Sequence, residues 1–498
     1  MTLVTEVSVA ARDIADLRAL VPADAFTRMV GSLGEVRDEL DGATLWEVNS
    51  TATGGGVAEM LQFLVAYQKG FGIDSRWAVL QGDAEFFRIT KRLHHALHGS
   101  AGDGSPLGAV EQARYQDTVG RNAREFLGMV RPGDRVLLHD PQTAALAPYL
   151  SERGCHVVWR CHIGHDQHNE HVAAGWDFLA PSLASVERLI FTRADYVPGA
   201  LAGDRVRIIT PCIDPMSPKN QALPPDEAIR ILQTEGVLGG VQPRPGTATF
   251  HREDGSVSPV THAAEILTCG TLPLPSDPLV TQVSRWDGLK DPIGVMHGFV
   301  HALGDDGLGG AHLLLAGPSC ASVQDDPEGL ETYEGVVAAW RALPEDARSR
   351  VHLASLPMDD REENAAIVDA VQSHAAVVVQ KSLHEGFGLT VTEAMWKAKP
   401  VVATAVGGIR DQIDHGVDGL LVDDPTDRDA FAAALRRAVL DVPGARDLGL
   451  RAKAKVAEHF LMDRYHERLA RILREISTGT AVEPVRPAGG AVRAARLE

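Results

Sequence analysis

Two acidic residues, Glu385 and Glu393, lie on either side of a glycine-rich turn in the stretch KSLHEGFGLTVTEAMWKAKP. Gly386 and Gly388 free the backbone to turn sharply, and Thr390 is a good N-cap for the helix that should follow. Backbone amides in the first turn of a helix lack partners within it and attract anions. The pattern therefore predicts a site for a ligand that carries phosphate and hydroxyl groups, with one glutamate at each end of it.

A structural role is an open alternative for Glu393 but not for Glu385. Thr390 and Glu393 have the spacing of a capping box, in which the acid only reaches back to the backbone amide of the cap residue. Glu385 stands between two turns and caps no predicted helix, so a ligand contact is the simpler interpretation.

The elements around this stretch follow the order strand, loop, helix, strand. An apolar run over residues 375–379 has the length of a buried strand, and a second begins at residues 401–402. Earlier in the chain, a predicted strand over residues 46–49 leads into STATGGG and then into a helix. Gly55 and Gly56 can bring backbone amides against a phosphate or a sugar there, although an ordinary tight connection explains them as well.

Polar side chains follow two further predicted strands. Residues 135–138 lead into HDPQ, and residues 156–160 lead into CHIGHD. Ligands collect at the carboxyl ends of the strands in a doubly wound sheet, so Asp140, Gln142 and His162 are candidates for the site. A histidine in such a place can also be structural.

Two cations, Arg285 and Lys290, follow the predicted strand over residues 279–284. Such a pair beside a helix N-terminus can neutralise a diphosphate, and arginine can do so through two hydrogen bonds at once. The alternative is that both side chains are simply solvated, as most lysines and arginines are.

The composition argues against several classes of protein. With 67 acidic against 48 basic residues, the net charge of −19 disfavours general binding to nucleic acid or acidic membranes. The five cysteines are scattered and the histidines lack a His-Glu-x-x-His spacing, so neither a disulfide framework nor a metal site is expected. The chain shows no secretory leader and no apolar run near the ~18 residues of a membrane span, which predicts a cytoplasmic protein.

The phrase HEGFGLTVTEAMWKAKP, followed by AVGGIRDQIDHGVDGLLV, resembles the retaining GT-B glycosyltransferases, and within them the trehalose glycosyltransferring synthases and the related trehalose phosphorylases. Further phrases that carry the resemblance are NSTATGGGVAEML, HDPQ, WRCHI, IDPMSPKN, QVSRWDGLKD and DDPEG. It implies an α/β protein with two doubly wound Rossmann-like domains facing a cleft. The alternation of predicted strands and helices is independently consistent with that fold.

The resemblance also implies the division of the chain into domains. Residues 1–220 should form an acceptor-side domain, and residues 221–460 a nucleotide-sugar-binding domain with a mobile insertion at about 239–278. A helix over 461–477 should pack back on the N-terminal domain. The tail 478–498, which is poor in large apolar residues, should be disordered.

Residue by residue, the resemblance assigns a donor site. Arg285 and Lys290 match the clamp on the leaving diphosphate, and Glu385 matches the acid that holds hydroxyls of the donor sugar. Glu393 matches the acid that binds ribose. The helix mouth that meets sugar and phosphate comprises Phe387, Gly388, Leu389 and Thr390.

The remaining matches lie in the N-terminal half of the chain. Gly55 and Gly56 match a glycine loop on the donor side, and Asp140 and Gln142 match residues near the acceptor. His162 matches the histidine that faces the donor pyranose, and is expected to be catalytic together with the two cations and the sugar-binding glutamate.

The implied activity is reversible transfer of glucose from a nucleoside diphosphate glucose to glucose, giving α,α-trehalose with the donor configuration retained. It needs no metal or other cofactor and only small-molecule partners, and a homodimer is compatible with it. A trehalose phosphorylase that uses phosphate or glucose 1-phosphate is the alternative, and a non-catalytic sugar-nucleotide sensor is a third. Asp369, Ala376 and His384 depart from the residues usual in the family, which leaves the exact subfamily open.

Overall fold

The computed structural model describes residues 2–53, 55–244, 246–304, 307–320 and 327–478. The described residues divide into two compact units. One is drawn from Met1–Ala15, Phe26–Pro211 and Met462–Glu498, and the other from Asp16–Ala25 and Cys212–Leu461. They are called the N-terminal and C-terminal units below. Apart from Thr478, the tail expected to be disordered lies outside the described residues.

The N-terminal unit is built on a seven-stranded sheet in the order β1-β3-β2-β4-β5-β6-β7, in which every neighbouring pair is parallel except β1 with β3. Its strands are β1 (Val4–Val7), β2 (Leu45–Asn49), β3 (Ser75–Leu80), β4 (Arg135–His139), β5 (His156–Cys161), β6 (Arg188–Phe191) and β7 (Val206–Ile208). Strand β4 is apolar on both faces and buried, as expected where helices cover both sides of a parallel sheet. From β2 the chain goes to β3 on one side and then to β4 on the other, so the strand order reverses between β2 and β4.

The helices of this unit are mostly amphipathic connections between those strands. They are α1 (Ala23–Leu40), α2 (Gly56–Gly70), α3 (Ala84–Leu97), α4 (Ala109–Phe126), α5 (Asp140–Thr143), α6 (Ala147–Glu152), α7 (Glu170–Leu179) and α17 (Met462–Thr478), with 3₁₀ turns η2 (Ala144–Leu146) and η3 (Ala194–Tyr196). The 3₁₀ turn η1 (Ile14–Ala19) and the first residues of α1 fall mostly in Asp16–Ala25, which belongs to the C-terminal unit.

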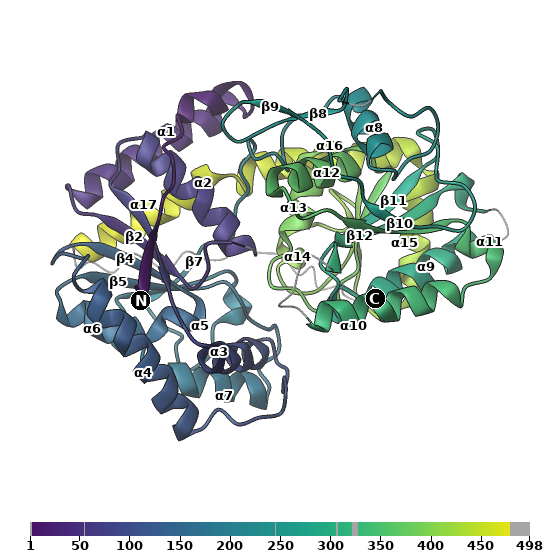
Figure 1. Cartoon of the computed structure of the whole chain (residues 1–498). Coiled ribbons are helices and arrows are strands. Elements are labelled where there is room, and N and C mark those ends of the chain that lie inside the picture. The colour runs from purple at the N-terminus through teal and green to yellow at the C-terminus, as the bar shows by residue number, and fades with distance from the viewer. Residues whose placement is uncertain (1, 54, 245, 305–306, 321–326, 479–498) are drawn as a thin grey trace, which may run out of the picture. The chain divides into compact units, whose positions relative to one another are not determined.

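The C-terminal helix α17 belongs to the N-terminal unit, although the sequence places it after the whole C-terminal unit. Figure 1 shows it in yellow alongside the purple helices α1 and α2. Its Asp463 accepts a hydrogen bond from Arg28 of α1 over 3.0 Å, and Glu475 near its other end accepts from Arg188 and Arg207. The helix that the sequence predicts over 461–477 is thus tied to the sheet by buried ion pairs.

The C-terminal unit has its own seven-stranded sheet, in the order β10-β13-β12-β11-β14-β15-β16, with only β10 antiparallel to its neighbour. Its strands are β10 (Glu265–Leu267), β11 (Leu279–Val283), β12 (His312–Pro318), β13 (Val351–Leu356), β14 (Val377–Gln380), β15 (Val401–Thr404) and β16 (Leu420–Val422). The chain runs from β11 to β12 and β13 on one side and then returns to β14 on the other. The strand order therefore reverses between β11 and β14, where ligands bind in open α/β sheets.

The helices of this unit are α8 (Pro225–Thr234), α9 (Pro292–Leu303), α10 (Pro327–Arg341), α11 (Glu345–Arg348), α12 (Arg361–His374), α13 (Leu389–Trp396), α14 (Ile409–Gln412), α15 (Arg428–Leu440) and α16 (Val442–His459), with 3₁₀ turns η4 (Gly288–Lys290) and η5 (Gly307–Gly310). Among the described residues, no helix is long and apolar enough to cross a bilayer. The two doubly wound sheets agree with the α/β fold class expected from the sequence.

The segment 239–278, for which no secondary structure was predicted, contains three short strands. Strands β8 (Thr249–His251) and β9 (Val257–Pro259) form an antiparallel hairpin, and β10 adds an edge strand to the main sheet. Arg252 pairs with Asp360 over 2.5 Å, which ties the hairpin to the start of α12. Strands of three residues among glycines and prolines carry too little periodicity to be seen in a sequence.

We expect Glu475→Gln to lower the melting temperature by several degrees. Its carboxylate is 1% exposed and lies 3.0 Å from the Nε atoms of both Arg188 and Arg207, so the amide would leave two buried guanidinium groups short of a countercharge. Breaking a buried ion pair from one side costs about 3 kcal/mol. Thermal unfolding followed by circular dichroism measures the effect.

The matched control is Glu467→Gln on the same helix, because Glu467 pairs with Arg464 over 3.0 Å while 41% exposed. This control should melt close to the wild type. Equal melting temperatures for both variants would contradict an anchoring role for Glu475.

Candidate active site

The loops that follow β11 and β14 are tied together at the reversal of strand order in the C-terminal unit. The Leu383 amide donates to the Leu289 carbonyl over 2.8 Å, and Gln282 Nε2 donates to the Lys290 carbonyl over 2.8 Å. The Lys381 amide donates to Gln282 Oε1 over 3.1 Å. Because Gln282 is 1% exposed and bonds both loops, it holds them as one platform at the carboxyl ends of the two strands.

Lys290 and Glu385 meet on this platform. Lys290 Nζ lies 2.5 Å from Glu385 Oε2, and the side chains are only 18% and 10% exposed. Glu385 also accepts from the hydroxyl of Ser382 over 3.2 Å. A charge-assisted contact this short, in a poorly solvated place, is among the stronger polar interactions in proteins. The structure thus brings together Lys290, predicted to bind the diphosphate, and Glu385, predicted to hold sugar hydroxyls.

Arg285, the second cation predicted for the clamp, is in a different environment. Its side chain is 69% exposed, and its guanidinium lies 3.3 Å from Asp287. Asp287 is the N-cap of η4, where its carboxylate accepts from the Leu289 amide. Arg285 therefore stands solvated at the rim of the loop that carries Lys290.

The helix mouth begins two residues earlier than the sequence suggested. Gly388 is the N-cap of α13, with a left-handed backbone at φ 85° and ψ 60°, which glycine adopts without strain. The prediction of Thr390 as the N-cap is therefore wrong, because Thr390 already lies inside the helix. The capping-box alternative for Glu393 falls with it, since the acid is not at the third position after the cap.

A second loop supports this mouth from behind. Gly408 donates its amide to the Gly386 carbonyl over 3.1 Å, and a Cβ at Gly408 would lie 2.6 Å from the Phe387 Cα atom. Gln412 is fully buried, donates to the Phe387 carbonyl and accepts from the Thr392 hydroxyl over 2.6 Å. Sequence reasoning missed both residues, although GGIRDQI follows the strand next to β14.

Glu393 lies among buried charges. It is 6% exposed, and its Oε1 is 3.7 Å from Lys219 Nζ. Lys397, one turn further along the chain, donates to the Glu393 carbonyl over 3.3 Å and lies 3.4 Å from Asp369. Burial raises the pKa of Asp369 to about 7, and the nearby Lys397 opposes that shift. Two lysines, Lys219 and Lys397, and two acids, Glu393 and Asp369, thus form one cluster beside α13.

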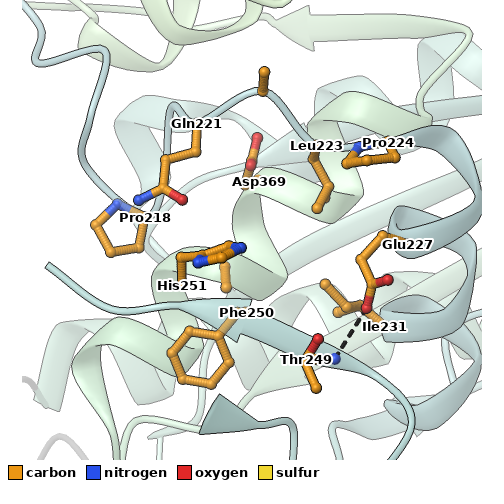
Figure 2. A pocket seen from close by; sticks show the side chains of 12 residues that line it. Pro218, Gln221, Leu223, Pro224, Glu227, Ile231, Thr249, Phe250, His251 and Asp369 are labelled. Carbon is orange, nitrogen blue, oxygen red and sulfur yellow. Dashed lines mark hydrogen bonds between the residues drawn. The ribbon is translucent and has the colours of Figure 1, made fainter. Parts of the chain in front are cut away.

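Asp369 also lines a cavity of about 270 Å³ that is bounded by α8, α12 and β8. Figure 2 shows its carboxylate on the side of Gln221, with Glu227 accepting from the Thr249 amide over 2.9 Å across the cavity. None of the predicted site residues is among those that line it. The cavity therefore belongs to the segment 239–278 and its neighbours rather than to the platform.

Asp140 lies at the corresponding reversal in the N-terminal unit, at the carboxyl end of β4. It starts α5 with a left-handed backbone, φ 62°, which is strained for most residues but tolerated by Asp and Asn. Its Oδ1 accepts from the His162 amide over 2.8 Å, and its carbonyl accepts from Trp159 Nε1 over 3.0 Å. Burial raises the pKa of Asp140 to about 6. Gln142 is half-buried on the same short helix.

His162 is joined to two side chains that sequence reasoning missed. Its Nε2 is 2.9 Å from His139 Nδ1, and His139 Nε2 is 2.6 Å from Glu47 Oε2. Burial, followed by the charge of Arg160, lowers the pKa of His162 well below its usual value, so its imidazole is neutral near pH 7. A glutamate inside the apolar strand β2 was the signal that could have revealed this chain of contacts.

Gly55 and Gly56 open α2 at the carboxyl end of β2. Gly55 is the N-cap with φ 81°, and a Cβ there would meet no atom within 4 Å, so glycine is needed for the backbone conformation rather than for space. Among the described residues, no group of three or more His, Cys, Asp or Glu side chains is arranged to hold a metal ion.

Comparisons with known proteins agree on one family. Sequence models described as "Trehalose synthase, N-terminal domain" and "Glycosyl transferases group 1" match residues 47–198 and 361–455. The chain is 34% identical over 454 residues to a trehalose synthase of Rubrobacter xylanophilus, which covers 91% of this chain and 94% of that protein. It is 33% identical over 475 residues to a trehalose synthase of Pyrococcus horikoshii, covering 95% and 99%. A trehalose phosphorylase of Pleurotus sajor-caju is 25% identical over 443 residues, covering 84% of this chain and 56% of the phosphorylase.

Solved structures confirm the GT-B fold. An α,α-trehalose-phosphate synthase (UDP-forming) from Burkholderia vietnamiensis superposes with a TM-score of 0.62 at 15% identity, covering 88% of this chain and 100% of that one. A sucrose-phosphate synthase from Thermosynechococcus elongatus gives a TM-score of 0.59 at 17% identity, covering 88% and 100%. At such low identity these likenesses concern the fold alone.

We expect the stability of the wild type relative to Asp140→Asn to fall as the pH rises from about 4 to about 6. The folded protein holds the Asp140 proton up to a pKa of about 6, above the ordinary value of 3.8, so protonation in this window favours the folded state. Asparagine tolerates the left-handed backbone and cannot titrate. Melting temperatures of both proteins across this pH range give the difference.

Asp38→Asn is the control, because Asp38 lies on the surface with its side chain 73% exposed. Its difference from the wild type should stay flat with pH. If the difference in melting temperature between the wild type and Asp140→Asn did not change with pH, Asp140 would have the same pKa in the folded and the unfolded protein, which would contradict the prediction.

Proposed function

Since this chain belongs to the trehalose synthase family of glycosyltransferases, we propose that it transfers glucose from a nucleoside diphosphate glucose to free glucose, with retention at the anomeric carbon, to form α,α-trehalose. The observation that carries the proposal is the contact of Lys290 with Glu385 at the mouth of α13. This contact places a lysine that can pair with a diphosphate beside a glutamate that can accept hydrogen bonds from sugar hydroxyls. The N–H groups of the first turn of α13 add positive potential at the same place.

In the proposed reaction, the bond between the anomeric carbon of glucose and the diphosphate oxygen breaks. A bond from that carbon to the acceptor hydroxyl oxygen forms on the same face of the sugar. The acceptor's proton passes to the departing phosphate oxygen, so no separate protein base is needed. Lys290, Arg285 and the amides of the α13 mouth stabilise the negative charge that develops on the diphosphate.

The diphosphate and Glu385 compete for Lys290 in this scheme. When the diphosphate pairs with Lys290, the Glu385 carboxylate is released and can accept hydrogen bonds from hydroxyls of the donor glucose. Glu393 is proposed to bind the ribose hydroxyls, since the structure excludes the capping box that would otherwise explain it. Lys219 Nζ lies 3.7 Å from the Oε1 atom of Glu393.

The N-terminal residues are proposed to serve the two sugars. His162 contacts the glucose that is transferred, Asp140 and Gln142 bind the acceptor glucose, and Gly55 and Gly56 let backbone amides approach the donor. The strained backbone of Asp140 supports a functional role, because such strain is retained mainly where a site requires it.

Trehalose phosphorylase remains the second candidate, because phosphorylases are among the relatives. The chain spans about half of their length, whereas it covers nearly the whole of the synthases at higher identity. A sensor without activity is a weaker candidate, since it would have no reason to keep Lys290 and Glu385 in contact.

The experiment that tests the proposal offers the purified protein glucose with a panel of nucleoside diphosphate glucoses, and in parallel with glucose 1-phosphate. We expect α,α-trehalose only from the nucleotide donors, and cleavage of trehalose only when a nucleoside diphosphate is supplied. Cleavage by inorganic phosphate, with the diphosphates inert, would replace the synthase by the phosphorylase. No turnover with any donor would favour the sensor.

We expect Glu385→Gln to lose roughly tenfold to a hundredfold in kcat, because a neutral amide holds the donor hydroxyls less well by about 1.5 to 3 kcal/mol. The same change removes the anion that competes for Lys290, so a nucleoside diphosphate should bind at least as tightly as to the wild type. Calorimetric titration and an assay of trehalose formation measure the two effects.

Lys290→Ala is the matched variant, because it removes the other partner of the Lys290–Glu385 contact. It should weaken diphosphate binding. A Glu385→Gln protein that binds the diphosphate more weakly than the wild type would contradict the competition described above.

A further inference from the structure

Three polar side chains form a diagonal row across the N-terminal sheet. Glu47 lies on β2, His139 ends β4 and His162 follows β5, and these three strands are neighbours in the sheet. Glu47 is in register with Leu137, and His139 is in register with Arg160. Residues two apart on a strand face the same side of the sheet. His139 therefore lies two residues further toward the carboxyl ends than Glu47, and His162 two residues further than His139. The row therefore runs from the sheet interior to its ligand-binding edge.

The contacts along this row are short and its inner members are buried. Glu47 Oε2 lies 2.6 Å from His139 Nε2, and His139 Nδ1 lies 2.9 Å from His162 Nε2. The side chains of Glu47 and His139 are both 0% exposed. The second oxygen of Glu47, Oε1, has no hydrogen-bond partner among the described residues, so His139 is the only group that compensates this carboxylate by hydrogen bonding there.

The charges around the row indicate where the protons lie. Arg160, which is 0% exposed, is in register with His139, and its charge favours the ionised form of Asp140. A second proton on His139 gives its buried pair with Glu47 no net charge, which is the favourable state for charges removed from water. The 2.6 Å contact between Glu47 and His139 has the length of a charge-assisted bond. His139 as an imidazolium donates to Glu47 from Nε2 and to His162 from Nδ1.

We propose that Glu47 and His139 are positioning residues that hold His162 as the tautomer with its proton on Nδ1. His162 Nε2 accepts from His139, so the remaining proton must sit on the other ring nitrogen. His162 then presents an N–H donor to a hydroxyl oxygen of the transferred glucose, instead of a lone pair. This assignment rests on the proposed function for the contact of His162 with the sugar, but the tautomer itself does not.

The direct test is the state of the His162 ring in the full-length wild-type protein. Labelling with ¹⁵N-histidine and long-range ¹H–¹⁵N correlation distinguishes the two neutral tautomers, and His162→Ala identifies the signals of this residue. We expect the proton on Nδ1. A proton on Nε2, or a doubly protonated ring at neutral pH, overturns the proposal whatever the variants do.

Glu47→Gln tests the cause of the tautomer. In this variant the glutamine oxygen accepts from Nε2–H of a neutral His139, so His139 Nδ1 becomes an acceptor and the proton of His162 moves to Nε2. An unchanged tautomer in this variant would show that Glu47 does not set it. His156→Gln is the matched control, because His156 lies at the opposite end of β5 and pairs with Glu187 near the surface over 2.9 Å. This control should keep the wild-type His162 signals.

Kinetics separate positioning from a merely structural role. We expect Glu47→Gln to lower kcat about tenfold, the value of one hydrogen bond, with the KM for the nucleotide donor within about twofold of the wild type. In a His162→Ala background the same change should have no further effect, because Glu47 acts through His162. Additive losses would assign Glu47 to stability alone. If the wild type forms no trehalose from any nucleotide donor, the proposed function fails, while the spectroscopic result still decides the tautomer.

Discussion

The contact between Lys290 and Glu385 is the interaction on which the C-terminal site depends. It exists because β11 and β14 are neighbours at the reversal of strand order, so that two loops whose contacting residues are 95 positions apart in the chain leave the sheet side by side. Gln282 bonds both loops, and the left-handed Gly388 starts α13 directly behind Glu385. Lys290, Glu385 and the N-terminus of α13 thus lie at one place, and their positions depend on the strand order, on Gln282 and on the backbone of Gly388.

The N-terminal unit uses the same geometry for a different purpose. Its strand order reverses between β2 and β4, and the side chains gathered there are acids and imidazoles rather than cations. Asp140 holds the backbone of His162, while Glu47 and His139 contact its ring. A single histidine is therefore fixed from two directions. Such support is what a group needs if it must face one sugar hydroxyl with the correct hydrogen-bonding character.

The sequence predicted the features that short-range pattern controls. The apolar runs of the parallel strands are visible because both faces are buried, and Lys290 and Glu385 were found at strand ends from their residue types. Gln412 and Glu47 were not found in this way, because their roles depend on partners distant in the chain or on adjacent strands, and the glutamate inside an apolar strand was the one signal for Glu47. The start of α13 was misplaced because Thr390 has the better side chain for a cap, while the tight turn at Gly388 requires a left-handed backbone.

A double-mutant cycle on nucleoside diphosphate binding tests whether Glu385 and the diphosphate compete for Lys290, with calorimetry of the wild type, Glu385→Gln, Lys290→Ala and the double variant. If the diphosphate replaces Glu385 at Lys290, removing the acid strengthens binding only while Lys290 is present. We predict that Glu385→Gln has no effect on affinity in the Lys290→Ala background. The same effect of Glu385→Gln in both backgrounds would contradict it, because the two residues would then act on the diphosphate independently.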